Sequence, residues 1–541
     1  MGVLLKFRIP GIQSYIFQTQ KLREIRGASA LVEDLSGTAM RRAIEAAGGN
    51  IWYLAAGHGV VQAQDHATAQ KVLTVIENQV TGTTVILTPQ FATAPLGSHP
   101  QSGQILKQLD HDLRHQVPKP VPFQPLHTVL RNCQSCQRYP MAHQRSHSDE
   151  RICAVCQKKY QRLAAKKRLP YWEKFADYIN AQASSNQDIR QSAWNRWVNA
   201  SQNGTQWEKD LLADDLNALS QHSLRHGYVA LIYADANHLG DFFENTYGNL
   251  GRYGDNLSGA ANELEAVSRK VIETMRQATY AAILRTWPLK VGDADRTLPK
   301  SLPFEILYLG GDDLLLVCAA DKGPDFALAL ADAFRECCKA NDLPLSLGTG
   351  LVLAKAHTPM AALIDHAKAV MASAKKYGFQ RQRRTEQMPL EQGYAIDVSL
   401  LTETSVLDLE EARQQAVSGG QPLRLSTLPH GREEFEKFLK SLKSLGKSRL
   451  RAIRFHPVLT ACRRSRLQGT VAAQALLGRM DHKERTASET MFRDASETLA
   501  DSGEQSWIEE LPWLVRNRQT CTVLGDFLDL APFLEGKGGM A

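Results

Sequence analysis

The sequence contains no run of about 18 or more apolar residues, the length that a membrane-spanning helix requires. Its opening residues, MGVLLKFRIPGIQSYIF, lack the charged region, apolar region and small-residue cleavage site of a secretory signal peptide. No low-complexity linker interrupts the chain, so we expect its domains to pack together. These absences predict a cytoplasmic protein with no membrane partner, whose cysteines are thiols or metal ligands rather than disulfides.

The composition is that of a globular protein with several domains. Of 541 residues, 43% are hydrophobic and 22% are charged, and the chain is too long for a single core. The net charge of +7 is unevenly distributed: residues 131–168 carry ten Lys/Arg against two acids, and residues 437–466 carry ten Lys/Arg and no acid. Each block can be a solvated helix face, but two blocks in one chain favour a phosphate-rich partner.

The order of predicted elements repeats once along the chain. Periodicity predicts a strand at 3–9, a helical stretch at 21–49, strands at 50–57 and 59–64, a helix at 67–80 and a β-rich segment at 83–94. The same order returns with a strand at 227–237, a helix at 262–284, strands at 302–311 and 312–320, a helix at 325–341 and a strand at 344–355, followed by a helix at 359–378 and a strand at 394–401. The order β-α-β-β-α-β is that of a ferredoxin-like fold.

These patterns predict a multidomain α+β protein. We expect a first ferredoxin-like domain at 1–97, a cysteine-containing and helical insert at 98–226, a second ferredoxin-like domain at 227–404 and an all-α domain at 405–541. The first copy has no acidic residue in its first strand, and its hairpin turn reads LAAGHGVV. Only the second copy therefore has the residues for chemistry at this position.

Three aspartates of the second copy are candidate catalytic residues. Asp235 ends the first strand, and Asp312 and Asp313 occupy the turn in EILYLGGDDLLLVCA. Gly-Gly before Asp is also ordinary turn chemistry, so a simple hairpin is the alternative. In this fold the first and third strands are neighbours, so the three carboxylates should converge. They would repel one another unless divalent cations neutralise them.

The residue types around these aspartates predict nucleotidyl transfer. Ligand sets made only of oxygen atoms favour Mg²⁺ or Mn²⁺, and a pair of such ions activates a hydroxyl and stabilises leaving pyrophosphate. Gly310 and Gly311 would let a triphosphate approach the backbone. Lys375 and Lys376, on the helix that follows, could reach the phosphates, or could be solvated surface lysines.

Four cysteines predict a structural zinc site between the two copies. They are Cys133, Cys136, Cys153 and Cys156, arranged as two Cys-x-x-Cys pairs. Paired knuckles of this kind supply a complete tetrahedral set of thiolates, which indicates a structural metal rather than a catalytic one. His143 and His147 lie inside the loop as reserve ligands. The remaining cysteines, at 318, 337, 338, 462 and 521, read as core residues.

The motif LGGDDLLLV, preceded by YADAN, resembles the palm domain of GGDEF-type nucleotide cyclases and related polymerases. The opening GIQSYIFQTQKLREIRGASALVEDL, the second palm with GGDD and the cysteine cluster between the palms together resemble the large subunit of type III CRISPR effector complexes. This subunit is the Csm/Cmr-type CRISPR polymerase. The resemblance extends in order over essentially the whole chain and is weakest in its C-terminal helical part.

The resemblance implies a target-RNA-activated synthetase that joins ATP into cyclic oligoadenylates. It implies Asp235, Asp312 and Asp313 as metal ligands, Gly310 and Gly311 at the phosphates, and a degenerate first palm that seats a second ATP. The implied partners are small and backbone subunits of the complex, guide crRNA and target RNA. Many relatives begin with an HD nuclease domain. The His111-Asp112 pair here has no further matching histidines and reads as a solvated helix, so DNA cutting is not predicted.

Two alternatives remain from the sequence. The first is a scaffold of the same complex that binds nucleotides without turnover, which a lost carboxylate would favour; none is missing. The second is a stand-alone cyclic dinucleotide synthase of the GGDEF class. Against it, the motif continues with Asp-Leu where that class has Glu-Phe.

Overall fold

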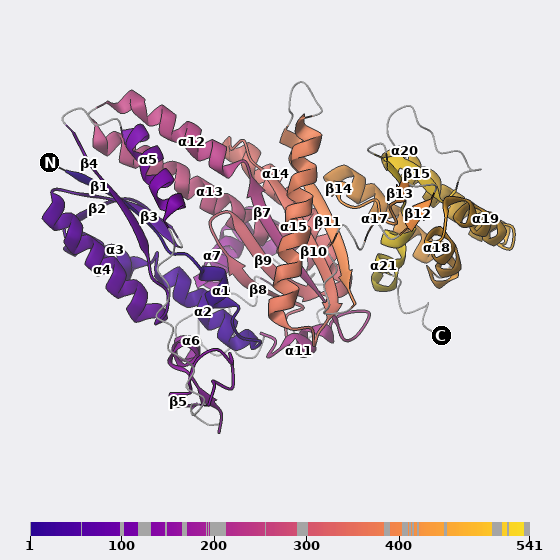
Figure 1. Ribbon diagram of the computed structural model, residues 1–541, viewed down its shortest axis with the longest axis horizontal. Helices are drawn as coiled ribbons and strands as arrows, with labels where there is room; N and C mark the ends of the chain where they lie inside the picture. The colour runs from indigo at the N-terminus through magenta and orange to yellow at the C-terminus, as the bar shows by residue number, and fades with distance from the viewer. Residues whose placement is uncertain are drawn as a thin grey trace.

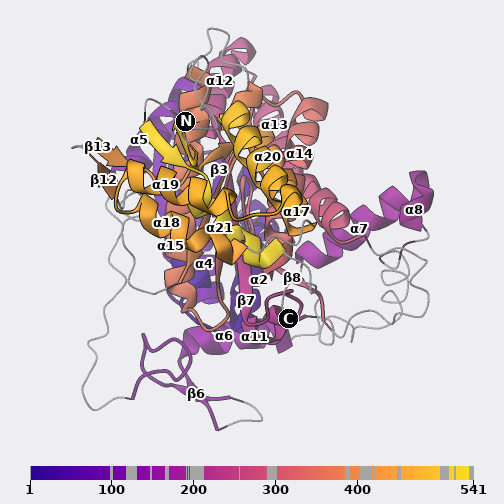
Figure 2. The same cartoon turned by 90° about the vertical axis from the view of Figure 1, so that its right-hand side faces the viewer.

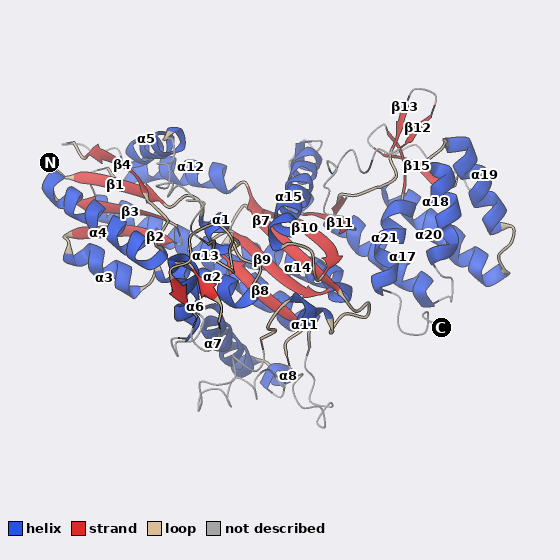
Figure 3. Cartoon of the chain, turned by 60° about the horizontal axis from the view of Figure 1, so that its bottom comes forward, coloured by secondary structure: helices blue, strands red, loops and turns tan. Residues whose placement is uncertain are grey.

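The computed structural model contains two β-sheet units, an insert that carries the cysteines and a C-terminal region rich in helices (Figures 1 and 3). It describes residues 2–55, 57–97, 102–116, 131–145, 149–164, 170–190, 192, 194, 212–254, 256–288, 301–383, 390–402, 409, 413, 416–418, 421–447, 452–499, 511–516 and 519–534.

The first unit is an antiparallel sheet of four strands in the order β2-β3-β1-β4. Its elements are β1 (Val3–Arg8), α1 (Ile12–Ile16), α2 (Leu22–Asp34), α3 (Thr38–Ala46), β2 (Gly49–Ala55), β3 (His58–Ala63), α4 (His66–Thr84) and β4 (Gln90–Pro95). This is the ferredoxin-like strand order that the sequence predicts. Leu5 and Phe7 pack with α2 to α4, whereas Leu4 packs with α5 (Ser102–His115) and α13 (Leu257–Thr286) on the opposite face.

The second unit is a sheet of six strands in the order β14-β11-β10-β7-β9-β8. Its elements are β7 (Tyr228–Asn237), α12 (Leu239–Asn249), η1 (Leu250–Tyr253), α13, β8 (Phe304–Leu309), β9 (Asp313–Ala319), η3 (Ala320–Lys322), α14 (Gly323–Asn341), β10 (Ser346–Lys355), α15 (Met360–Arg383), η4 (Leu390–Gly393), β11 (Ala395–Leu401) and β14 (His430–Gly431). The strands β8, β9, β7 and β10 repeat the order of the first sheet. β11 extends it by pairing parallel to β10.

Both faces of the second sheet are buried. Ala230 and Ile232 of β7 belong to a core with α13 and α14, and Leu231 and Tyr233 belong to a core with α15 and the first unit. Burial on both sides explains why the strand YVALIYA is almost continuously apolar rather than alternating.

The two units contact each other directly. Arg26 of α2 forms a buried ion pair with Glu305 of β8, with Nη2 to Oε2 at 2.8 Å. The 30-residue helix α13 packs against both β2 and α14, so it lies along both units (Figure 1). The two units therefore share a packed interface.

The insert packs on both units. It contains β5 (His143–Gln144), β6 (Arg151–Ile152), α6 (Ala154–Ala164), α7 (Pro170–Ser185), α8 (Gln187–Arg190) and α11 (Leu216–Ser220). α6 lies against α2, and a Cβ added to Gly27 would lie 2.0 Å from the carbonyl oxygen of Lys159. Figure 2 shows β6 below the body of the molecule, with α6 between them.

The expectation of an all-α C-terminal region is wrong. Its helices are α17 (Arg432–Lys447), η5 (Ala452–Phe455), α18 (His456–Cys462), α19 (Arg466–Leu477), α20 (His482–Leu499) and α21 (Leu524–Leu534). It also contains two hairpins, β12 (Ala416–Ser418) with β13 (Gln421–Leu423) and β15 (Trp513–Arg516) with β16 (Gln519–Thr522). Strands of three or four residues are too short to show a period of two in the sequence.

The β-rich segment predicted at 83–94 is only partly a strand. α4 continues through Thr84, and β4 begins at Gln90. The Thr84 hydroxyl donates to the carbonyl of Val80 and accepts from the amide of Leu87, which closes the helix end. Leu87 is buried in the core although it is not in a strand, so its apolar character misled the prediction.

No helix within the described ranges is long and apolar enough to cross a membrane. The division of the chain at residues 97, 226 and 404 stays a prediction.

Candidate active site

The turn between β8 and β9 brings the three predicted aspartates together. Asp313 is the register partner of Asp235 across β7 and β9, and the amide of Ala236 donates to the carbonyl of Asp312 at 3.0 Å. The amide of Gly310 closes the turn on the carbonyl of Asp313 at 2.8 Å. The hairpin alternative was therefore correct about the turn, and the turn also holds the carboxylates beside Asp235.

Two of these carboxylates are held where their charge is unfavourable. Burial, followed by the charge of Asp235, raises the pKa of Asp312 to about 6. Burial, with the charges of Asp312 and Asp235, raises the pKa of Asp313 well above its usual range. Carboxyl groups whose ionisation is disfavoured by burial and by neighbouring acids fit a site that binds a cation.

Asp235 is paired with a lysine of the helix α15. The Lys375 ammonium lies 2.7 Å from Asp235 Oδ1 and donates to the carbonyl of Ala236 at 3.1 Å. Gly348 of β10 permits this, because a Cβ there would lie 2.4 Å from Lys375 Cγ. A glycine inside a strand often marks such a close approach, so this signal was present in LGTGLV.

The two predicted lysines do not act together. Lys376 is exposed and lines a different pocket, next to Tyr377 and Arg424. Adjacent residues on a helix point about 100° apart, so only one of them can face the sheet. The structure thus brings Lys375, but not Lys376, to the aspartates.

The two glycines of the turn have different surroundings. A Cβ on Gly310 would lie 2.2 Å from Asp313 Oδ1 and 2.7 Å from the Tyr308 hydroxyl. A Cβ on Gly311 would meet only Ile272, at 3.5 Å. Gly310 therefore makes room for the Asp313 side chain, whereas Gly311 leaves its space open at the wall of a pocket.

That pocket, about 460 Å³, opens between the two sheet units. The first unit contributes Lys6, Arg8 and Tyr53, and the second contributes Gly311 and Asp312. Arg8 donates to Gln90 at 2.7 Å, and burial lowers the pKa of Lys6, which contacts Asp110 and Tyr247. Cations thus face a carboxylate across a space large enough for a nucleotide.

The four predicted cysteines form a compact buried group. Their Sγ atoms all lie within 4.8 Å of one another, and Cys136 Sγ and Cys153 Sγ are 3.7 Å apart. Four sulfurs at this spacing fit a tetrahedral metal ion. Among the described residues, no other set of three or more ligand side chains is drawn together as tightly.

The other predicted residues lie outside the aspartate and cysteine groups. His143 is exposed in β5, and His147 lies outside the described residues. His111 and Asp112 form an exposed pair 3.7 Å apart on α5. Cys318, Cys338, Cys462 and Cys521 are buried, and Cys337 is half-buried.

The basic block at 437–466 is partly neutralised by acids outside it. Lys440 pairs with Glu436 at 2.8 Å, and Lys443 pairs with Asp325 of α14. A count of charges along 437–466 could not detect these partners, which favours the solvated-face interpretation for these two lysines.

The second unit also matches a known domain family. Residues 228–384 match the model of the Cas10/Cmr2 second palm domain. The second sheet unit is therefore similar to the Cas10/Cmr2 second palm domain. No curated protein matches the chain.

Several solved structures share the fold of the whole chain. Csm1 in T. onnurineus is 15% identical with a TM-score of 0.53, over 98% of this chain and 69% of that one. A Csm1-Csm4 cassette in complex with cA4 is 14% identical with a TM-score of 0.54, over 98% and 70%. A cassette in complex with cA3 is 14% identical with a TM-score of 0.51, over 98% and 69%. The resemblance to the type III CRISPR large subunit is thereby confirmed.

Sequence reasoning missed two residues beside the aspartates of the second unit. Gln13 of α1, in the first unit, donates from Nε2 to Asp313 Oδ2 at 3.3 Å and contacts the Tyr233 hydroxyl. Tyr233 in turn reaches Asp313 Oδ2 at 3.4 Å. The only signal for Gln13 was one amide side chain in the apolar opening GIQSYIF.

Proposed function

We propose that the chain is the large subunit of a type III CRISPR complex that converts ATP into cyclic oligoadenylates. The observation that carries this proposal is the placement of Asp235 beside Asp313 across β7 and β9, with Asp312 next to them in the turn and at the wall of the pocket between the two palm-like units.

The reaction is nucleotidyl transfer with loss of pyrophosphate. The 3′-hydroxyl of one ATP attacks the α-phosphorus of another, so one P–O bond forms as the bond to the β-phosphate bridge breaks. The hydroxyl proton is released, and repetition followed by closure gives a ring. Preference for adenine rests on the relatives.

Asp235, Asp312 and Asp313 are the residues that would hold two Mg²⁺ or Mn²⁺ ions. Asp312 and Asp313 have no cationic side chain hydrogen-bonded to them in the described part of the chain, and their raised pKa values fit residues that would bind a cation. Bound ions of this kind activate the attacking hydroxyl and stabilise the leaving pyrophosphate. Gly311 would let the phosphates approach the turn, and Lys375 would contribute a point charge near Asp235.

The first unit would seat the second nucleotide. It supplies Lys6 and Arg8 to the pocket but has no acid at the position equivalent to Asp235. A unit that retains the fold without the carboxylates fits a binding role rather than a metal-binding one.

The cysteine group would hold zinc as a structural ion. Its four sulfurs would supply all four ligands of such an ion, which would leave no position for substrate.

The relatives support the products and the partners. Structures with the same fold contain cA4, cA3 and the linear pppApA, bound to a Csm1-Csm4 cassette. We therefore expect this chain to assemble with companion subunits of a type III complex, with guide crRNA and with target RNA that activates synthesis.

One observation favours the scaffold alternative. Lys375 already neutralises Asp235, so this carboxylate has a cation without a metal ion. In a scaffold the ion pair would persist and nucleotide would bind without turnover. In the synthetase Asp235 would exchange the lysine for a metal ion.

The test is product analysis with labelled ATP on the assembled complex, with guide RNA and Mg²⁺ or Mn²⁺, with and without target RNA. We expect target-dependent cyclic oligoadenylate that disappears in the Asp312→Ala, Asp313→Ala double variant. Asp241→Ala, which removes a 79% exposed acid of the nearby α12, is the control and should remain active. Binding of ATP without product, unchanged in the double variant, would leave the scaffold.

A further inference from the structure

We propose that a second, polar pocket between α15 and the C-terminal region binds a small molecule through a polyphosphate group. The pocket measures about 350 Å³ and shares no lining residue with the pocket between the two units. Its walls come from α15, from the segment 424–429 and from the hairpin of β15 and β16.

The charge of this lining is entirely positive. Lys376, Arg424 and Arg516 line the pocket, and no Asp or Glu does so among the described residues. Arg516 and Arg381 share one carboxylate partner: Glu434 lies 2.8 Å from Arg516 and 3.4 Å from Arg381. A lining that carries three cationic side chains and no acid favours an anion.

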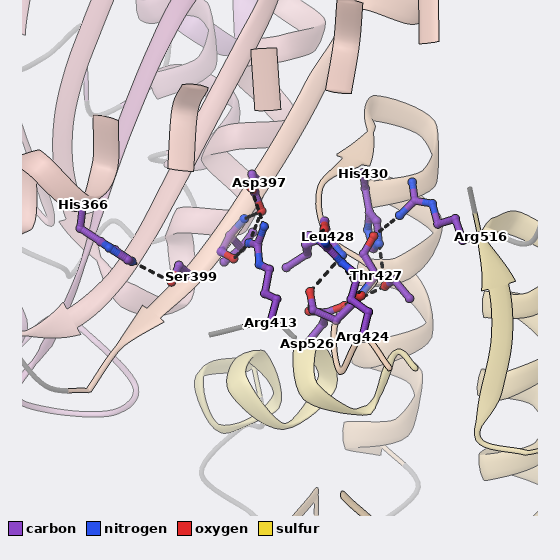
Figure 4. A network of polar contacts seen from close by, with 12 residues as sticks. His366, Asp397, Ser399, Arg413, Arg424, Thr427, Leu428, His430, Arg516 and Asp526 are labelled. Carbon is purple, nitrogen blue, oxygen red and sulfur yellow. Dashed lines mark hydrogen bonds and ion pairs between the residues drawn. The ribbon is translucent and has the colours of Figure 1, made fainter. Parts of the chain in front are cut away.

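The wall of the pocket is fixed by buried hydrogen bonds (Figure 4). Asp526 accepts from the amide of Thr427 at 2.6 Å and from its hydroxyl at 2.7 Å, and the same hydroxyl lies 2.9 Å from His430 Nε2. Arg424 donates to the carbonyls of Ser426 at 3.0 Å and Leu428 at 2.6 Å. A wall held in this way is ordered before a ligand arrives, which lowers the entropic cost of binding.

The rim retains donors for a ligand. Lys376 and Gln380 are exposed on successive turns of α15, and neither forms a hydrogen bond or ion pair with the described residues. Ser373 lies one turn before Lys376 and adds a hydroxyl to the same wall. An ammonium, an amide and a hydroxyl on one helix face can donate together to phosphate oxygens.

Size and polarity define the ligand class. A volume near 350 Å³ is at the lower end of small-molecule sites and suits a pyrophosphate or a nucleotide rather than a folded macromolecule. The shared chemistry of these ligands is a polyphosphate, and they are distinguished by whether a nucleoside adds affinity.

The proposal is tested by isothermal titration calorimetry of the full chain in the presence of EDTA. Inorganic pyrophosphate and ATP are titrated separately. Without divalent ions the three aspartates repel an anion, whereas the second pocket needs no metal. We expect metal-independent binding that Lys376→Glu weakens about tenfold or more, since the charge reverses at contact distance. Gln380→Glu, a milder rim change, should weaken it in the same direction. Equal affinity for the two ligands would show that the phosphates alone are recognised. Tighter binding of ATP would show that the nucleoside also contributes to the affinity.

Lys368→Glu is the matched control, because Lys368 lies on the same helix, outside the pocket lining, and pairs with Asp365 at 3.9 Å. The Asp312→Ala, Asp313→Ala variant should keep the binding, so this proposal and the proposed function can fail separately. Unchanged affinity in both rim variants, or binding of single-stranded RNA but of neither pyrophosphate nor ATP, would overturn the proposal.

Discussion

At the scale of single residues, Gly310 and Gly311 differ in the space that surrounds them. Gly310→Ala would place a Cβ against Asp313 and Tyr308, and we expect a loss of about 1–3 kcal/mol in the free energy of unfolding. Gly311→Ala meets only Ile272 and should change stability by less than about 0.5 kcal/mol. Urea unfolding of both variants checks this.

Activity separates the roles of the two glycines further. If phosphates approach the turn at Gly311, Gly311→Ala should lower synthesis while the protein stays as stable as wild type. Full activity of this variant would show that substrate does not use the open space.

Burial makes the negative charge of Asp312 unfavourable in the folded protein when no metal ion is bound. Its pKa rises from 3.8 to about 6 on folding, so ionisation destabilises the folded state. The penalty is absent below the lower pKa, grows between the two values and is complete above about pH 6. We therefore expect Asp312→Asn to be more stable than wild type by about 1 kcal/mol at neutral pH in EDTA, after allowance for its partial exposure.

Unfolding of wild type and Asp312→Asn by urea at about pH 4 and about pH 7.5 measures this difference. The two proteins should have similar stability at the lower pH. A variant that is less stable than wild type at neutral pH would contradict the account of Asp312.

The sequence was informative about these residues because acids in an apolar strand are unfavourable unless a cation compensates their charge. It predicted that Asp235 lies beside Asp312 and Asp313, since strand order alone brings them together. It could not predict that Gln13 reaches Asp313, because that contact joins residues 300 positions apart through the packing of two units. It also could not separate Lys375 from Lys376, because helix rotation is set by the packing of α15 on Gly348.

At the scale of secondary-structure elements, α2 and β8 are joined by the buried pair Arg26–Glu305. Replacement of Arg26 by methionine leaves Glu305 buried without a cation, and we expect a loss of about 3–5 kcal/mol. The double variant Arg26→Met, Glu305→Met should recover much of this loss. Arg285→Met, which breaks the exposed pair with Glu336, should cost less than about 1 kcal/mol.

Unfolding free energies of these variants form a simple comparison. If Arg26→Met is as mild as Arg285→Met, the ion pair does not stabilise the contact between the two units. If the double variant is as unstable as the single one, the loss comes from packing rather than from unpaired charge.

Elements with long apolar periods were predictable, and short ones were not. The strand 227–237 and the helix 325–341 lie close to β7 and α14. The helices α1 and α12 and the C-terminal hairpins were missed, because α1 and the hairpin strands have five residues or fewer and α12 has little apolar periodicity.

At the scale of the whole molecule, the repeat of β-α-β-β-α-β predicted two sheets with the same strand order. The sequence did not reveal how closely the units pack, because α13 and the pair Arg26–Glu305 connect residues far apart in the chain. This packing creates the pocket that carries the proposed function, with cations from the first unit and Asp312 from the second.

The central claim is that the second palm holds catalytic cations through three aspartates. Its most direct test is titration of the protein with Mn²⁺ in the presence of ATP, followed by electron paramagnetic resonance of the free ion. The account predicts two bound Mn²⁺ ions that are lost in Asp312→Ala, Asp313→Ala and retained in Asp241→Ala. The same number of tightly bound ions in the double variant and in wild type would contradict it.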